Sequence, residues 1–242
     1  MIEVRDLWKS FKGKQVLKGV DLFIKEGEIF VVIGRSGVGK SVLLKNMVGL
    51  MKPDKGKILY KGRDLTGASE AEWKDVRREF AVVFQHSALF DSMNVGENVA
   101  FGLKRMTNLE EGEIRERVKR CLSMVGLEGA ENLRISELSG GMQKRVAIAR
   151  AIALNPGVIF YDEPTTGLDP IMSANITNLI IKMNREIGST SFIITHDLRL
   201  AFTAGTTIAM LHDGKIINVG EPDTIKKSSN PIVRKFVEGI PD

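Results

Sequence analysis

The chain contains the stretch Gly-Arg-Ser-Gly-Val-Gly-Lys-Ser at residues 34–41, which matches the phosphate-binding pattern G-x-x-x-x-G-K-[ST] at every fixed position. The stretch Glu-Ile-Phe-Val-Val-Ile precedes it at residues 28–33 and is apolar at every position after the glutamate, and such runs are typical of a strand that is covered on both faces. The residues that follow, 41–50, carry apolar side chains at helical spacing. We therefore predict a strand, a tight loop and a helix in this order.

The residue types of this loop suit a bound triphosphate. Its three glycines let the backbone N–H groups turn inward, and the start of the helix adds partial positive charge. Lys40 can reach the terminal phosphates, and the Ser41 hydroxyl can bind Mg²⁺. A glycine-rich turn that only starts a helix would explain Gly34 or Gly39, but not the adjacent Lys-Ser pair. The pattern favours a nucleoside triphosphate site.

Size and composition fit one large α/β domain or one such domain with an inserted lobe, since the chain has 242 residues and 43% of them are hydrophobic. Its apolar runs are far shorter than the roughly 18–20 residues that cross a bilayer. We expect a cytosolic chain that reaches a membrane only through a partner. The 35 basic and 30 acidic residues are interspersed, so the net charge of +5 does not predict nucleic-acid binding.

Periodicity divides the chain into three kinds of segment. Two alternating runs near the N-terminus predict an antiparallel hairpin, and its turn carries Phe11, which could stack on a base or pack on the hairpin. Helical spacing without strand signals predicts a helical lobe inserted into the α/β core. We expect the core with its β subdomain at residues 1–86 and 156–228, the helical subdomain at about 87–155, and a C-terminal tail at 229–242.

A second anion site is predicted where Ser139, Gly140 and Gly141 precede a helical run. Uncapped N–H groups and the positive end of the helix dipole point the same way at such a start. A Ser N-cap followed by glycines that permit close packing explains the same residues in isolation.

Acidic residues follow another buried strand, because the apolar run 158–161 ends in Asp162 and Glu163. Open α/β sheets bind ligands beside such strand ends. Asp162 suits a Mg²⁺ shell, and Glu163 suits the polarisation of an attacking water. A solvated pair of loop acids is disfavoured directly after four apolar residues. His196 follows the strand 191–195 at the same edge and could donate to a phosphate.

Together these features resemble the nucleotide-binding subunit of ABC transporters over essentially the whole chain. The resemblance rests on the loop, Gln85, the segment 138–141, the Asp162-Glu163 pair, the segment 167–169 and His196, in this order. It implies a P-loop NTPase (ABC ATPase) fold of class α/β, with an antiparallel β subdomain and an inserted helical subdomain. It also implies an ATPase that uses ATP and Mg²⁺.

The resemblance implies a role for each matched residue. Glu163 would be the catalytic base, His196 the switch at the γ-phosphate, Gln85 the residue that senses Mg²⁺ and links to the membrane subunit, and Lys40 a further catalytic group. The metal ligands would be Ser41, Gln85 and Asp162. The residues that contact nucleotide would be Phe11 on the adenine, with Gly34, Arg35, Ser36, Gly37, Val38, Gly39, Lys40, Ser41, Val42, Ser139, Gly140, Gly141 and Asp169.

In this family the Leu-Ser-Gly-Gly element closes on nucleotide held by the opposite subunit, so two chains would sandwich two ATP molecules. Met142 stands where many relatives have Gln, which leaves the Ser139 and glycine N–H donors in place.

Several further segments of the sequence resemble those of the ATPase of the MCE-associated, Mla-type phospholipid or organic-solvent-tolerance transporters. These segments are Leu-Ser-Gly-Gly-Met and residues 90–95 and 230–240. The resemblance implies a homodimer, an integral membrane permease, a periplasmic MCE-domain lipid carrier, and a peripheral place on the cytoplasmic side of the inner membrane. A small-solute importer ATPase, such as one for amino acids, and an iron–sulfur assembly ATPase remain alternatives. DNA-repair and ribosome-acting types need a long coiled coil or a second cassette, and the sequence has neither.

Overall fold

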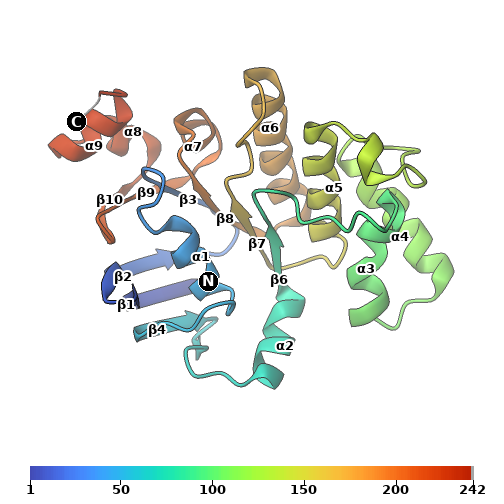
Figure 1. Cartoon of the computed structure of the whole chain (residues 1–242), viewed down its shortest axis with the longest axis horizontal. Coiled ribbons are helices and arrows are strands. Elements are labelled where there is room, and N and C mark those ends of the chain that lie inside the picture. The colour runs from blue at the N-terminus through green and yellow to red at the C-terminus, as the bar shows by residue number, and fades with distance from the viewer. Residues whose placement is uncertain (241–242) are drawn as a thin grey trace.

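The structure is a computed structural model that describes residues 1–240, and it contains two sheets flanked by helices (Figure 1). The larger sheet has the strand order β10-β9-β3-β8-β7-β6, and it is parallel except for β10, which pairs antiparallel with β9. Its strands are β3 (Ile29–Ile33), β6 (Phe80–Val83), β7 (Val158–Asp162), β8 (Thr190–Thr195), β9 (Thr207–His212) and β10 (Lys215–Gly220).

The smaller sheet is antiparallel in the order β2-β1-β4-β5, and its strands are β1 (Ile2–Phe11), β2 (Lys14–Ile24), β4 (Lys55–Tyr60) and β5 (Arg63–Asp64). The predicted hairpin is confirmed by the pairing of β1 with β2. Phe11 is the last residue of β1 rather than a turn residue, since the chain reverses at Lys12 and Gly13, which both have positive φ.

The helices are α1 (Lys40–Met47), α2 (Glu70–Glu79), α3 (Val95–Met106), α4 (Glu111–Met124), the short 3₁₀ helix η1 (Ile135–Glu137), α5 (Gly140–Ile152), α6 (Pro170–Ile187), α7 (Leu198–Ala204), α8 (Pro222–Lys226) and α9 (Pro231–Val237). The first helix ends three residues before the predicted position, because Gly49 takes a left-handed conformation at φ 71°. Among residues 1–240, no helix combines the length and the apolar character that crossing a bilayer requires.

The central strand β3 divides the hydrophobic core in two. Its residues Ile29, Val31 and Ile33 belong to the cluster on the side of α3 to α7, whereas Phe30 and Val32 belong to the cluster with α1 and the antiparallel sheet. Alternate side chains of a strand point to opposite faces, and both faces are covered here. This explains why residues 29–33 form a continuous apolar run.

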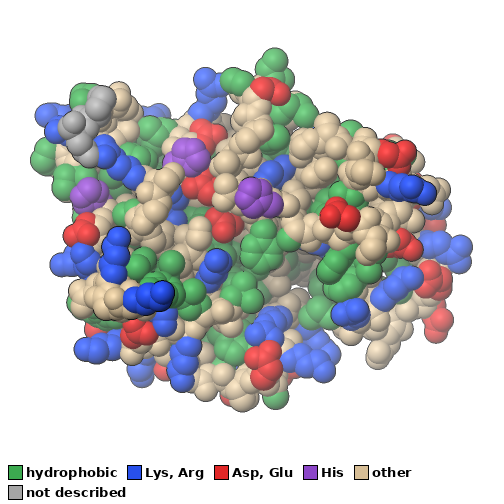
Figure 2. Space-filling view, in the orientation of Figure 1, with side chains coloured by type: hydrophobic (Ala, Val, Ile, Leu, Met, Phe, Trp, Pro, Cys, Tyr) green, Lys and Arg blue, Asp and Glu red, His purple; other side chains and the backbone are tan. Residues whose placement is uncertain are grey.

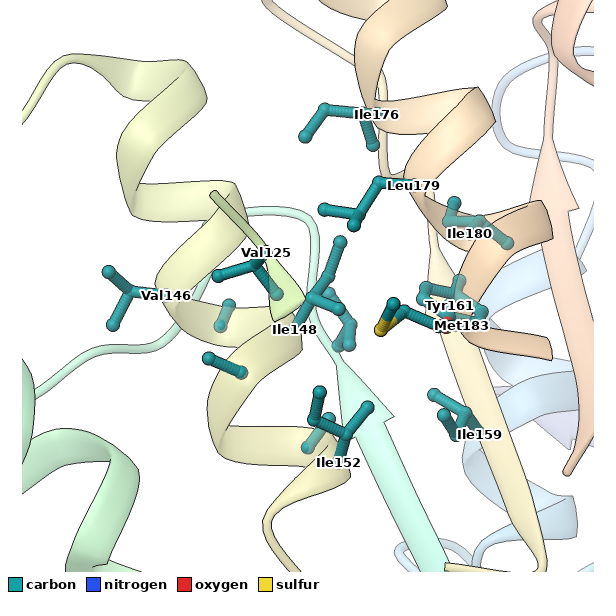
Figure 3. Close-up of a cluster of buried hydrophobic side chains, with 14 of the residues drawn as sticks. Val125, Val146, Ile148, Ile152, Ile159, Tyr161, Ile176, Leu179, Ile180 and Met183 are labelled. Carbon is teal, nitrogen blue, oxygen red and sulfur yellow. The ribbon is translucent and has the colours of Figure 1, made fainter. Parts of the chain in front are cut away.

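Helix α5 joins the helical lobe to the large sheet. It lies between α6 and the pair α3 and α4 (Figure 1). Ile148 and Ile152 of α5 face Leu179 and Met183 of α6 above strand β7 (Figure 3), and all of these side chains are buried. The α/β core, the antiparallel sheet and the helical lobe that we predicted are therefore all present.

How the chain divides at residues 87, 156 and 229 stays a prediction, and residues 241–242 of the predicted tail lie outside the described residues. On the face shown in Figure 2, Lys and Arg side chains are spread over several elements with acidic side chains between them.

Candidate functional site

The loop between β3 and α1 depends on glycine. Gly39 stands at the N-cap of α1 with φ 113°, and a Cβ there would lie 3.1 Å from both the backbone oxygen and a methyl carbon of Val16. Any other residue would be strained and crowded at this position. Gly37 has φ 79°, and apart from Gly37 and its two chain neighbours no atom of residues 1–240 lies within 4 Å of the place its Cβ would take. The loop therefore presents open backbone on one side and packs tightly on the other.

Lys40 lies across this loop. Its ammonium group donates to the carbonyl oxygens of Gly34 at 2.7 Å and Arg35 at 3.1 Å, and it forms an ion pair with Glu163 Oε1 at 3.2 Å. Only 5% of the side chain is exposed. A buried cation needs such partners, because removal of its hydration is costly. The lysine is thus held between the phosphate-binding loop and the acid that follows β7.

Glu163 connects three parts of the site. It follows β7 in a left-handed conformation at φ 47°, and its backbone N–H donates to Ile194 of the neighbouring strand β8. Its Oε2 lies 2.8 Å from Nδ1 of His196 and accepts a hydrogen bond from Thr195 Oγ1 at 3.2 Å. One oxygen of the carboxylate therefore contacts Lys40 and the other contacts the end of β8.

Asp162 and Ser41 place two oxygen atoms together beside Lys40. The Ser41 hydroxyl donates to Oδ1 of Asp162 at 3.2 Å. Burial raises the pKa of Asp162 and the Ser41 hydrogen bond opposes this rise, while the nearby charge of Glu163 adds to it. Hydroxyl and carboxylate oxygens are ligands that Mg²⁺ prefers. A buried carboxylate in this environment fits a divalent cation, whose charge would offset the cost of its burial.

A cleft of about 450 Å³ opens in front of these groups, and its described lining is Phe11, Val16, Ser36, Gly37, Gly39, Lys40, Ser41, Val42, Gln85, Glu163, Thr166 and His196. Phe11 contributes an aromatic ring to this lining, and the residue is 42% exposed. The cleft thus combines open loop backbone, a cation, an acid and an aromatic face, which is what a nucleoside triphosphate needs.

Val16 and Thr166 line this cleft although sequence analysis did not select them. Thr166 lies three residues after Glu163, and that nearness in sequence was the available signal. Val16 lies in β2, and the local sequence carried no signal for it.

Lys144 is a further residue near the site to which no sequence pattern pointed. This residue of α5 is 5% exposed and donates to the backbone carbonyl of Gln85. Burial lowers the pKa of Lys144, and the carboxylate of Asp162 opposes that effect.

The second predicted anion site lies apart from this cleft. Ser139 accepts a hydrogen bond from the Met142 N–H at 3.3 Å and caps α5, and both Ser139 and Gly140 are exposed. Asp169 caps α6, since its Oδ1 accepts from the N–H groups of Ile171 and Met172 at 2.9 Å each. The described lining of the cleft includes neither cap. Within one chain, the structure does not bring residues 139–141 or 169 to the phosphate-binding loop.

Comparison with known proteins identifies the family. The family model described as ABC transporter matches residues 17–166. The chain is 42% identical over 238 residues to the "Probable ribonucleotide transport ATP-binding protein mkl" of Mycobacterium leprae, which covers 98% of this chain and 69% of that protein. It is 38% identical to the "Intermembrane phospholipid transport system ATP-binding protein MlaF" of Haemophilus influenzae, over 100% of this chain and 92% of that protein.

Solved structures agree with this match. The dimeric ATP-binding cassette MJ0796, in a post-hydrolysis state bound to ADP and Pi, superimposes with a TM-score of 0.84 at 35% identity, over 92% of this chain and 99% of that chain. Both the predicted fold class and the predicted resemblance are confirmed. The chain belongs to the ABC transporter family, in which it is an ATP-binding and ATP-hydrolysing subunit.

Proposed function

We propose that this chain works as one half of an ATP-driven dimer that powers a membrane permease for phospholipids. The observation that carries the assignment of the active site is the carboxylate of Glu163, which contacts Lys40 with one oxygen and His196 with the other. Phosphoryl transfer depends on positioned charge more than on covalent chemistry, and this network positions both signs of charge beside the loop.

Glu163 acts as the general base in this proposal. Its left-handed backbone and its contacts with β8 hold the carboxylate at the edge of the cleft, where it polarises an attacking water. Lys40 exchanges the carbonyl oxygens of Gly34 and Arg35 for phosphate oxygens, since the same ammonium can donate to either. His196, whose side chain is half-exposed, donates from its ring toward the terminal phosphate.

Ser41, Asp162 and Gln85 would hold Mg²⁺, which would supply positive charge to offset that of a bound triphosphate. Phe11 stacks on the base, because its exposed ring lies at the cleft. The open backbone of residues 34–39 and the start of α1 bind the phosphates by their N–H groups.

The other half of each site comes from a second copy of the chain. Ser139 and Gly140 are exposed at the start of α5, and Gly141 is buried behind them. None of the three belongs to the described lining of the cleft in their own chain, and Asp169 caps the neighbouring helix α6. A helix start of this kind binds anions, so we propose that it closes on the triphosphate of the partner chain. The dimeric cassette to which the chain is similar supports this assembly.

The lipid assignment rests on the relatives and on the Mla-type sequence details. The relative from Haemophilus influenzae is named for intermembrane phospholipid transport and matches the entire chain. The chloroplast protein TRIGALACTOSYLDIACYLGLYCEROL 3 of Arabidopsis thaliana is 42% identical over the whole chain. We propose that the partners are an integral permease and a periplasmic MCE-domain protein. The chain would bind the permease at the cytoplasmic side of the inner membrane.

Affinity purification of the chain from solubilised membranes tests these partners. We expect a multi-span permease and an MCE-domain protein in the complex, with ATP-dependent movement of a labelled phospholipid between vesicles after reconstitution. A second candidate, ribonucleotide transport, is favoured by the similarity to the mycobacterial relative, which is named for that activity. Uptake of labelled ribonucleotide without lipid movement by the same complex would select that candidate and contradict the lipid proposal.

A further inference from the structure

The segment 85–88 follows β6, and two long cationic side chains of α5 hold it. The ammonium of Lys144 donates to the backbone carbonyl of Gln85. The guanidinium of Arg150 donates through Nη1 to the carbonyl of Ala88 at 2.7 Å and through Nη2 to that of Ser87 at 2.8 Å. Three of the four carbonyl groups of this segment therefore accept hydrogen bonds from charged donors of one helix. Such bonds are stronger than those between neutral groups.

The backbone of the segment is strained where Arg150 holds it. Ser87 and Ala88 have φ values of 60° and 47°, so two consecutive residues with side chains occupy the left-handed region. Residues of this kind stay in that region only when their surroundings enforce it, and the enforced conformations often serve function. Ser87 is buried, whereas Ala88 is exposed. The two hydrogen bonds of Arg150 supply a constraint that the local sequence lacks.

Helix α5 connects the Ser139 cap to this segment. It begins directly after Ser139 and is fastened along its length by buried apolar residues that face α6 and β7 (Figure 3). Lys144 lies near the start of the helix and Arg150 lies in its last turn. A packed helix moves as a rigid element, because interiors are close-packed and incompressible. Movement of the helix start therefore moves both cationic groups.

We propose that Lys144 and Arg150 are positioning residues that fasten the segment 85–88 to α5, so that Gln85 moves together with the helix start at Ser139. This inference rests on the proposed function, in which that helix start meets the nucleotide of the partner chain and Gln85 acts at the metal. Neither residue contacts the substrate. Their effect is to make the position of Gln85 depend on whether the partner's nucleotide has been engaged.

Arg145 offers a matched control on the same helix. It neighbours Lys144 in sequence and its Nη1 donates to the carbonyl of Val125 at 3.0 Å, at the C-terminal end of α4. This bond stays within the helical lobe and does not reach the segment 85–88. If Lys144 and Arg150 only stabilised the fold, loss of any of the three donors would have the same kind of effect on activity.

The test compares ATPase kinetics of the intact complex that carries Lys144→Met, Arg150→Met or Arg145→Met. We expect kcat to fall about tenfold or more for Lys144→Met and Arg150→Met, because charged hydrogen bonds that position Gln85 are lost. The KM for ATP should stay within about threefold, and the Mg²⁺ concentration for half-maximal rate should rise. Arg145→Met should keep kcat per folded molecule. Lys144→Gln and Arg150→Lys retain a donor and should recover part of the loss.

Amide hydrogen exchange supplies the second readout, with a non-hydrolysable ATP analogue and Mg²⁺. In the wild-type complex, nucleotide should change exchange in residues 84–89 and 139–146 together. In Lys144→Met and Arg150→Met, only residues 139–146 should respond. An unchanged kcat, an equal loss in Arg145→Met, or a full response of residues 84–89 in both variants would overturn the inference while leaving the ATPase proposal intact. A wild-type complex that does not hydrolyse ATP would overturn both.

Discussion

Two helices of this chain begin with glycine-rich segments, and their surroundings differ. Helix α1 starts after Gly39 inside a cleft, where Lys40 and Glu163 already form an ion pair at 3.2 Å. Helix α5 starts after Ser139 on an exposed surface, capped by its own serine. Both starts offer N–H groups to an anion. Only the first is surrounded by the cation, acid and histidine to which the proposed function assigns hydrolysis.

This difference separates the helix start that can bind a triphosphate by itself from the one that needs a second chain to form a site. The loop before α1 can hold a triphosphate and position the chemistry within one chain, whereas the start of α5 has anion-binding chemistry without a cleft around it. Under the proposed function, the second start becomes useful only when another copy of the chain brings its own loop to it. The four predictions below test this contrast, beginning with the largest expected effect.

Glu163→Gln tests whether the acid beside the start of α1 carries out the chemistry in the cleft. The amide cannot serve as a general base, so we expect kcat to fall by roughly 10²–10⁴-fold while ATP still binds. Slow hydrolysis should also retain nucleotide between two chains. Steady-state ATPase assays and size-exclusion chromatography with ATP and Mg²⁺ would measure both effects. Hydrolysis near the wild-type rate would show that another group is the base.

Mixed dimers test whether the start of α5 acts on the partner. Ser139→Asp keeps a good helix cap but places negative charge beside the proposed phosphate position, and Lys40→Ala removes the loop cation. Each variant alone should lose about 10²-fold or more in ATPase rate. A mixture should recover activity, because a heterodimer joins the intact loop of one chain to the intact Ser139 of the other. Failure to recover activity at every mixing ratio would argue against action between chains.

Alanine in place of one glycine at each helix start, Gly39 before α1 and Gly140 in α5, should change the unfolding free energy by different amounts. Gly39→Ala forces a side chain to adopt φ 113° against Val16, so we expect a loss of about 1–3 kcal/mol of unfolding free energy. Gly140→Ala should change stability by no more than about 0.5 kcal/mol, because a Cβ there meets only Leu168 at 3.9 Å. Urea denaturation of both variants measures these values. Equal destabilisation would remove the structural basis of the contrast.

Substitutions of two aspartates, Asp169 and Asp162, should give the smallest effects, which are small changes in Tm. Asp169→Ala removes the cap of α6 and should cost about 1 kcal/mol, or roughly 2–4 °C in Tm. Asp162→Asn should instead raise Tm at neutral pH in the absence of divalent cations, since it removes a buried carboxylate that has few compensating contacts.

The pH dependence of the Asp162→Asn effect follows from the direction of the pKa shift. Burial raises the pKa of Asp162 above its ordinary value of 3.8, so the folded chain binds this proton more tightly than the unfolded chain does. The stability that the folded chain gains from binding this proton is present below pH 3.8 and is lost as the pH rises through the raised pKa of Asp162. The gain in Tm should therefore shrink on acidification. A gain that is independent of pH would contradict this account.

Local sequence patterns predicted most of the parts of this site. The loop 34–41 and the apolar strand that ends in Asp162 and Glu163 each depend on residues close together in the chain, as does the separate Ser139 cap. Phe11 and His196 were also selected, and the structure places both at the cleft. Val16, Thr166 and Lys144 were missed. Their importance comes from contacts with residues far away in the sequence.

The sequence by itself determined which elements form and which residue types end them, because glycine conformation, helix capping and side-chain alternation are local properties. Tertiary structure alone decided that β8 lies between β3 and β7, which brings His196 to 2.8 Å from Glu163. It also decided that α5 donates to the strained segment 85–88 through Lys144 and Arg150. Strand order and helix packing follow from burial of whole faces, and no local spacing encodes them.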